Sequence, residues 1–119
     1  MSTSFYISLA KKYVELSNKQ ELEQIFEMFA ATASYTSESA GSANGLIDII
    51  SLIENFYREH PDVCWEVDEY EETTPRWVEF DFIRSQTNPE NGGVERQRGR
   101  EIIEFTKQGL IKRIKVQQR

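Results

Sequence analysis

The chain has 119 residues and a net charge of −6. This length fits one domain, residues 1–119, with a core large enough to fold without disulfides, and the single cysteine, Cys64, has no intrachain partner. The acidic balance argues against general nucleic-acid binding, which needs a basic surface. No apolar run reaches the roughly 18 residues of a membrane span, and we see no signal-peptide pattern at the N-terminus. We therefore expect a soluble, cytoplasmic protein that binds neither nucleic acid nor membrane.

Two segments near the N-terminus have the apolar spacing of amphipathic helices. The first covers residues 6–16, and its apolar face includes Tyr13. The second covers residues 21–29 and follows the polar stretch SNKQE, in which Asn18 is placed to cap it with a glutamate three residues on.

The next stretch is small and polar. Residues 32–37, TASYTS, are compatible with a short strand, and residues 37–45 have the composition of a loop. A third amphipathic helix is predicted over residues 46–60, and Pro61 ends it.

After Pro61 the apolar period changes from 3.6 to 2, which predicts β-strands. Four strands joined by short turns favour an antiparallel meander: residues 63–71, 76–84, 94–105 and 110–116. Three helices covering one face of such a sheet define an α+β architecture. The expected inner face carries Val63, Trp65, Val67, Val78, Phe80, Phe82, Ile103 and Phe105.

Charge is distributed unevenly over these strands. Residues 66–81 hold seven acidic side chains and one basic one, whereas residues 84–119 hold nine basic and four acidic ones. The strands of opposite charge can lie side by side and form cross-strand pairs. Alternatively, RQRGR (96–100) and KRIK (112–115) form an anion-binding patch. On the same outer face, the large apolar residues Trp77, Ile83 and Ile102 predict contact with a second copy of the chain, a homodimer.

Glu101 shares the inner face with Ile103 and Phe105. A carboxyl group among apolar side chains must be paired, hydrated, or protonated with a raised pKa, and an inward acid near a cleft is a candidate site residue. A partly buried ion pair with an arginine, or a strand whose faces are reversed, would explain it equally well. Tyr13 has two interpretations as well, because an aromatic residue on a buried helical face is commonly part of the core.

The order of these elements resembles the nuclear transport factor 2-like superfamily, which includes SnoaL-like polyketide cyclases and ketosteroid isomerase. The stretches that carry the resemblance are YVELSNKQELEQIFEMF (13–29), NGLIDIISLIENFYREHPD (44–62) and GREIIEF with QGLIKRI (99–114). It implies a cone, in which a curved sheet wraps around a helix and leaves a pocket at the open end. Members include isomerases, dehydratases, cyclases, non-catalytic ligand binders and dimeric adaptor domains.

The resemblance also implies roles for particular residues. Tyr13 and Glu101 stand where ketosteroid isomerase-like members carry the tyrosine and the protonated acid of an oxyanion hole. Those members have a general-base aspartate in the loop after the second helix. Here that place is occupied by Ser37, and Glu38 beside it is the candidate base.

The sequence thus predicts a pocket for a small hydrophobic molecule, with chemistry next to a carbonyl if the protein is an enzyme. The residues expected to contact this ligand are Phe26, Phe29, Trp65, Phe80, Phe82 and Ile103. No cofactor is expected, since there is no phosphate-binding glycine loop, and His60 with Asp62 is too little for a metal site. The alternative is a protein-interaction domain whose pocket is vestigial.

Overall fold

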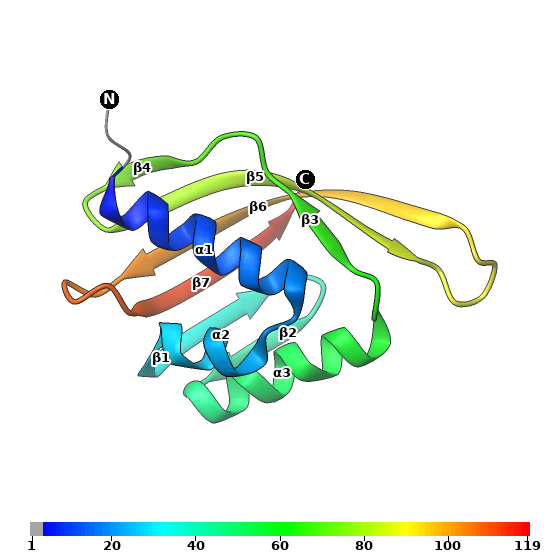
Figure 1. The fold of residues 1–119 in the computed structure, drawn as a ribbon, viewed down its shortest axis with the longest axis horizontal. Coiled ribbons are helices and arrows are strands. Elements are labelled where there is room, and N and C mark those ends of the chain that lie inside the picture. The colour runs from blue at the N-terminus through cyan, green and yellow to red at the C-terminus, as the bar shows by residue number, and fades with distance from the viewer. Residues whose placement is uncertain (1–3) are drawn as a thin grey trace.

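A computed structural model of the chain describes residues 4–119, so residues 1–3 of the predicted domain lie outside the described part. Three helices and seven strands are present in this range (Figure 1). The helices are α1 (Phe5–Lys19), α2 (Leu22–Met28) and α3 (Leu46–Glu59). The strands are β1 (Phe29–Ser37), β2 (Gly41–Asn44), β3 (Cys64–Glu66), β4 (Glu71–Thr74), β5 (Trp77–Thr87), β6 (Val94–Phe105) and β7 (Ile111–Gln118).

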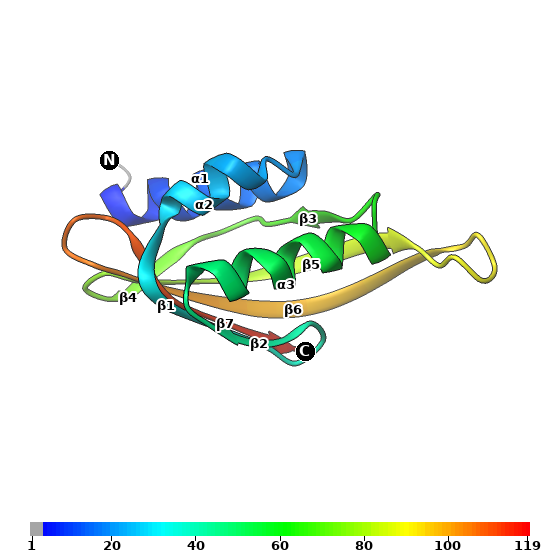
Figure 2. The same ribbon diagram turned by 90° about the horizontal axis from the view of Figure 1, so that it is seen from below.

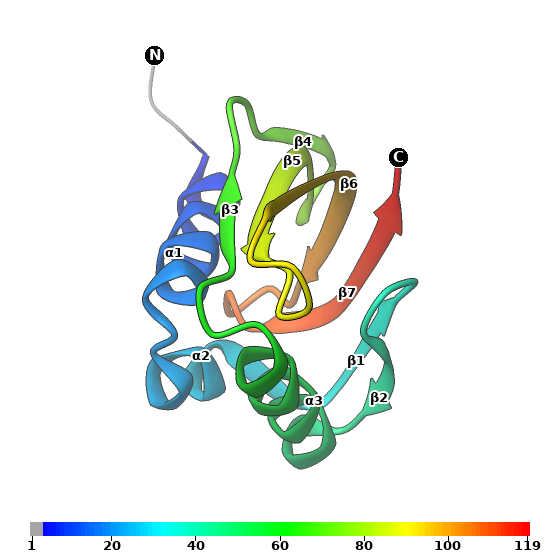
Figure 3. The same ribbon diagram turned by 90° about the vertical axis from the view of Figure 1, so that its right-hand side faces the viewer.

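All seven strands belong to one sheet in the order β2-β1-β7-β6-β5-β3, and β4 also pairs with β5. The sheet is strongly curved and the three helices lie on its concave side (Figures 2 and 3). The predicted α+β cone is therefore confirmed. The C-terminal strands pair antiparallel, as predicted, and β1 joins them through a parallel pairing with β7.

The strand predicted over residues 63–71 is two short strands instead. β3 pairs with one end of β5 and β4 pairs with the other, and residues 67–70 leave the sheet between them. Tyr70 packs its ring 4.8 Å from the ring of Phe80, so the segment is held over the inner face by side-chain packing rather than by strand pairing.

The region after α2 is more regular than its composition predicts. β1 begins at Phe29, directly after α2, and β1 and β2 form a hairpin across the turn at residues 38–40. Gly41 has φ +103°, a conformation that side chains disfavour, and it starts the return strand. Part of the stretch expected to be a loop is thus β-sheet.

Asn18 does not cap α2, because α1 continues to Lys19 and ends at Gln20 in a left-handed conformation. The amide of Asn18 donates to the Trp65 carbonyl at 2.9 Å, and the Trp65 backbone N–H donates to Asn18 Oδ1 at 2.8 Å. These two bonds fix the end of α1 to β3.

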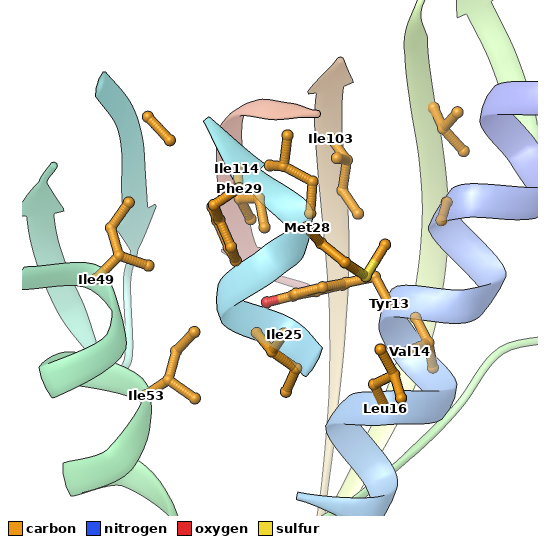
Figure 4. Close-up of a cluster of buried hydrophobic side chains, with 14 of the residues drawn as sticks. Tyr13, Val14, Leu16, Ile25, Met28, Phe29, Ile49, Ile53, Ile103 and Ile114 are labelled. Carbon is orange, nitrogen blue, oxygen red and sulfur yellow. The ribbon is translucent and has the colours of Figure 1, made fainter. Parts of the chain in front are cut away.

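The core lies between the helices and the inner face of the sheet (Figure 4). Alternation placed most of the inner-face residues correctly, since Val63, Val78, Phe80, Phe82, Ile103 and Phe105 are all buried. Trp65 and Val67 are only partly buried, at the border of the core.

The outer face shows why the charge is uneven. Arg100 of β6 forms 3.0 Å ion pairs with Glu79 and Asp81 of β5, and Glu104 lies 3.6 Å from Lys112 and 3.7 Å from Arg113 of the next strand. The oppositely charged strands therefore lie side by side, as the first interpretation predicts. None of the helices formed by residues 4–119 has the length and apolarity to cross a membrane.

Candidate functional site

A cavity opens between α1, α3 and the concave face of the sheet. The room that it leaves for the centres of water-sized molecules is about 40 Å³. Its lining is apolar in the middle and polar at both ends. The lining residues are Tyr13, Val14, Ser17, Tyr35, Ser37, Ser39, Ala40, Leu52, Ile53, Phe56, Tyr57, Trp65, Arg84, Glu101 and Val116.

Glu101 occupies the inner end. It lies on β6 opposite Phe80 of β5 and Val116 of β7, and only 5% of it is exposed. No residue among 4–119 hydrogen-bonds or ion-pairs with its carboxyl group. Burial raises the pKa of this carboxyl from 4.5 to about 8. At pH 7 the protonated form then exceeds the carboxylate by about ten to one.

Three tyrosines surround this acid. Burial raises the pKa of Tyr13 well above 10, and proximity to Tyr35 and Glu101 raises it further. Burial also raises the pKa of Tyr35 strongly and that of Tyr57 to about 12, and the charge of Glu101 adds to both shifts. All three phenols are therefore neutral near pH 7. The Tyr57 hydroxyl already donates to a backbone carbonyl, which leaves Tyr13 and Tyr35 as possible hydrogen-bond donors to a ligand.

Tyr13 belongs to α1, Tyr35 to β1 and Tyr57 to α3. Tyr13 extends from α1 between Ile25 and Met28 of α2, with its hydroxyl oxygen directed away from its own helix (Figure 4). Its ring meets that of Phe29 edge to face at 6.0 Å. The core thus sets the direction of the Tyr13 side chain.

Ser17 links α1 with α3 beside the same cavity. Its hydroxyl donates to the Tyr13 carbonyl at 2.7 Å, one helical turn back. The Tyr57 hydroxyl donates to the Ser17 carbonyl at 2.9 Å. This pair of bonds fixes the position of the Tyr57 oxygen.

Arg84 occupies the opposite end of the cavity, near the turn at residues 38–40. It is 8% exposed, and its guanidinium lies over the ring of Phe56, 5.1 Å from the centroid. The turn itself is ordered by Ser37, whose hydroxyl oxygen accepts hydrogen bonds from the backbone N–H of Ser39 at 3.3 Å and of Ala40 at 3.1 Å.

The structure brings some of the predicted site residues together. Tyr13, Glu101 and Trp65 all line the cavity. Glu38 does not, because the tight turn directs it into solvent while its neighbours Ser37 and Ser39 border the cavity. The role of Glu38 as a base stays a prediction, for a side chain that is exposed beside the cavity.

The predicted ligand contacts other than Trp65 lie elsewhere. Phe26 is 42% exposed, since the short helix α2 buries Ile25 and Met28 instead. The side chains of Phe29, Phe80, Phe82 and Ile103 are part of the solid core. Phe80 and Phe82 also border a wide, open hollow at the β5 edge, beside residues 67–70.

Sequence reasoning missed five polar residues of the cavity: Ser17, Tyr35, Ser39, Tyr57 and Arg84. Tyr57 has the spacing of the apolar face of its predicted helix, and Tyr35 lies in a short predicted strand with no known neighbour. Arg84 follows Phe80 and Phe82 at the same period of two, so alternation already places it on the inner face. Within residues 4–119 there is no group of three or more His, Cys, Asp or Glu side chains suited to hold a metal ion.

No protein-family model matches the chain, and no curated protein sequence matches it. Solved structures do. An NTF2-like protein of unknown function from Burkholderia pseudomallei superposes with a TM-score of 0.86 at 14% identity, covering 98% of this chain and 92% of that one. A candidate SnoaL-like polyketide cyclase from Shewanella putrefaciens gives 0.84 at 10% identity, covering 98% and 81%.

A third match is SalBIII, an epoxide hydrolase/cyclase-like enzyme with a role in pyran ring formation in the polyether salinomycin. It gives a TM-score of 0.84 at 15% identity and covers 96% of this chain and 90% of that one. At these identities the matches establish the fold. The chain has the fold of the NTF2-like and SnoaL-like proteins, as the sequence resemblance predicts.

Proposed function

We propose that this protein binds a small, partly apolar carbonyl compound in the cavity and moves a proton next to the carbonyl, as an isomerase or lyase. The observation that carries the proposal is the buried Glu101 carboxyl, which lines the cavity beside Tyr13, has no protein partner within residues 4–119 and has its pKa raised to about 8. A catalytic acid or base works best when its pKa lies near the working pH.

The remaining groups fit the same reaction. In its ionised form Glu101 accepts a proton from the carbon next to the carbonyl, and the same carboxyl then returns it to a second carbon as the double bond shifts. The phenol of Tyr13 donates a hydrogen bond to the oxygen on which negative charge develops, while the Tyr57 hydroxyl stays bound to the Ser17 carbonyl. Such donors are strong in a water-poor site. One carboxyl thus takes the part that the sequence assigned to Glu38.

The comparisons support this class of function without specifying it. The similar structures include a candidate polyketide cyclase and an epoxide hydrolase/cyclase-like enzyme. The free room of about 40 Å³ favours a small ligand, and a larger one requires the lining side chains to move apart.

Cyclohex-3-enone is a suitable probe, since its isomerisation to the conjugated enone is followed by ultraviolet absorbance. We expect the wild type to accelerate this reaction and Glu101→Gln to lose about a hundredfold or more of the rate, because the amide keeps the shape but transfers no proton. Glu90→Gln, an exposed change in the β5–β6 turn, is the control and should keep full activity.

Binding is measured separately by the fluorescence of Trp65 in a Trp77→Phe background, where Trp65 is the sole tryptophan. If the protein binds the conjugated enone but does not isomerise cyclohex-3-enone, the protein is a ligand-binding domain and the catalytic part of the proposal is wrong. Neither binding nor turnover would favour the protein-interaction alternative with a vestigial pocket.

A further inference from the structure

Arg84 is a buried cation with no anionic partner among residues 4–119. It lies on the inner face of β5, is 8% exposed and lines the cavity. No carboxylate of residues 4–119 lies within ion-pair distance of it. Burial lowers the pKa of the guanidinium, and Tyr35 and then Glu95 oppose this shift only through space. Buried charges in proteins are normally paired.

Neutral acceptors hold the guanidinium in one orientation. Its Nε donates to Gln86 Oε1 at 3.2 Å, its Nη1 to Ser39 Oγ at 3.0 Å and its Nη2 to Gln97 Oε1 at 2.7 Å. These partners come from β5, β6 and the turn at residues 38–40. They satisfy three of the five N–H groups of an arginine, so two remain without a partner in the described part of the chain.

The two polar ends of the cavity are well separated. Arg84 is directly opposite Gln97 on β6, and Glu101 lies four residues further along that strand. At the rise of a β-strand this is about 14 Å between backbone positions. Consistent with this, Arg84 is not among the causes of the raised pKa of Glu101. The apolar lining residues include Val14 and Ile53, and Trp65 lies at the Arg84 end, directly opposite Arg84 on β3.

From this arrangement we propose that the ligand is an oxo-carboxylate, whose carboxylate pairs with Arg84 while its ketone oxygen accepts a hydrogen bond from Tyr13 and the carbon next to the ketone faces Glu101. The inference rests on the proposed function and deepens it by naming the chemical class of the substrate. A guanidinium fork matches a planar carboxylate with two parallel hydrogen bonds. Arg84 is the one cationic side chain that lines the cavity in the described chain, which favours a monoanion over phosphate.

The test compares levulinate, an oxo-carboxylate, with levulinamide, which has the same shape and no charge. Levulinate is too short to reach both polar ends of the cavity, so the comparison isolates the pairing of its carboxylate with Arg84. Binding is followed through Trp65 in the Trp77→Phe background. We expect levulinate to bind at least about tenfold more tightly than the amide, as is usual for a charge-assisted pair in a desolvated site. In Arg84→Gln this preference should fall to about twofold or less, while the amide binds as before.

Two further variants separate recognition from general effects. Arg96→Gln removes the same charge from an exposed position on the outer face and should keep the preference for levulinate. Arg84→Lys keeps the charge but loses the fork, so it should retain only part of the preference. Circular dichroism of each variant reports whether the fold is intact, and the wild-type comparison of the two probes needs no variant.

The outcomes distinguish this inference from the function on which it rests. Equal affinity of the wild type for levulinate and levulinamide overturns the carboxylate assignment and leaves the cavity as a site for neutral carbonyl compounds. Persistence of the preference in Arg84→Gln overturns the role of Arg84. Failure of both probes to bind overturns the proposed binding function and this inference together.

Discussion

Among single residues, Glu101 is a buried acid whose ionised form is disfavoured by its surroundings. An ionised carboxylate in its position has no hydrogen bond from residues 4–119 and little water, so folding favours the protonated form. A residue kept there for stability alone would be replaced more favourably by glutamine or leucine. A buried acid that lines a cavity with three tyrosines is instead a candidate functional residue.

Glu101 makes the stability of the protein depend on pH. The pKa rises from 4.5 in the unfolded chain to about 8 in the fold, so the folded state binds the extra proton between these values. The free energy of unfolding should then fall as pH rises through this window, by at most about 1.4 kcal/mol per pH unit.

Glu101→Gln removes this dependence. Denaturant titrations between pH 4.5 and 8 should show the variant gaining on the wild type as pH increases, whereas Glu90→Gln follows the wild type throughout. Parallel curves for wild type and Glu101→Gln would show that the carboxyl titrates at an ordinary pKa, and the catalytic proposal would lose its basis.

The sequence predicts single residues well where the pattern is local. Helical spacing placed Tyr13 inside and strand alternation did the same for Glu101, since both depend on neighbours a few residues away. Tyr35 could not be assigned in this way. Its neighbour is β7, almost eighty positions later, and a parallel pairing of that kind leaves no local signal.

At the level of elements, the packing of β5 against β6 depends on one glycine, Gly99. Phe82 lies opposite Gly99, and a Cβ added there would collide with Cζ and both Cε atoms of Phe82. The end of the ring therefore occupies the space that a side chain at position 99 would need. Any side chain at position 99 would move Phe82 out of the core and disturb the strand on which Arg84 stands.

Gly99→Ala should accordingly destabilise the protein by about 1–3 kcal/mol, the usual cost of overpacking. Thermal unfolding measures the loss, and the double variant Phe82→Ala/Gly99→Ala tests its cause. If the clash is responsible, the alanine at 99 should cost much less in the Phe82→Ala background than in the wild type. An equal cost in both backgrounds would assign the effect to the backbone of β6 instead.

The elements themselves were predictable in proportion to their apolar periodicity. α1, α3, β5, β6 and β7 have clear patterns and lie close to the expected ranges. β1 and β2 consist mostly of small and polar residues. β1 is a strand because it pairs with the edge of β7, and β2 is a strand because it pairs with β1. The division of β3 from β4 depends on Tyr70 packing against Phe80, a contact that spacing alone does not reveal.

For the whole molecule, the outer face of the sheet is the surface without a covering layer. The helices all lie on the concave side (Figure 2). On the opposite side, Trp77, Ile83 and Ile102 remain partly exposed among the ion pairs of Arg100 with Glu79 and Asp81. A two-fold axis brings such a patch against itself, so that apolar groups meet and acidic and basic rows can exchange partners.

We therefore propose a homodimer through this outer face, and Ile102→Lys is the variant that tests it. A lysine buried there without a partner should weaken association about a hundredfold or more, corresponding to about 3 kcal/mol. Sedimentation at several concentrations should show a dimer for the wild type and a monomer for Ile102→Lys.

Ile47→Lys, at a site that is 76% exposed on α3, makes the same change on the helical side and should stay dimeric. A wild-type monomer would rule out the dimer. A dimer that Ile102→Lys leaves intact would place the contact on another surface. Because the cavity opens on the concave side, a dimer of this kind leaves both cavities accessible, and its dissociation should not change the affinity for levulinate.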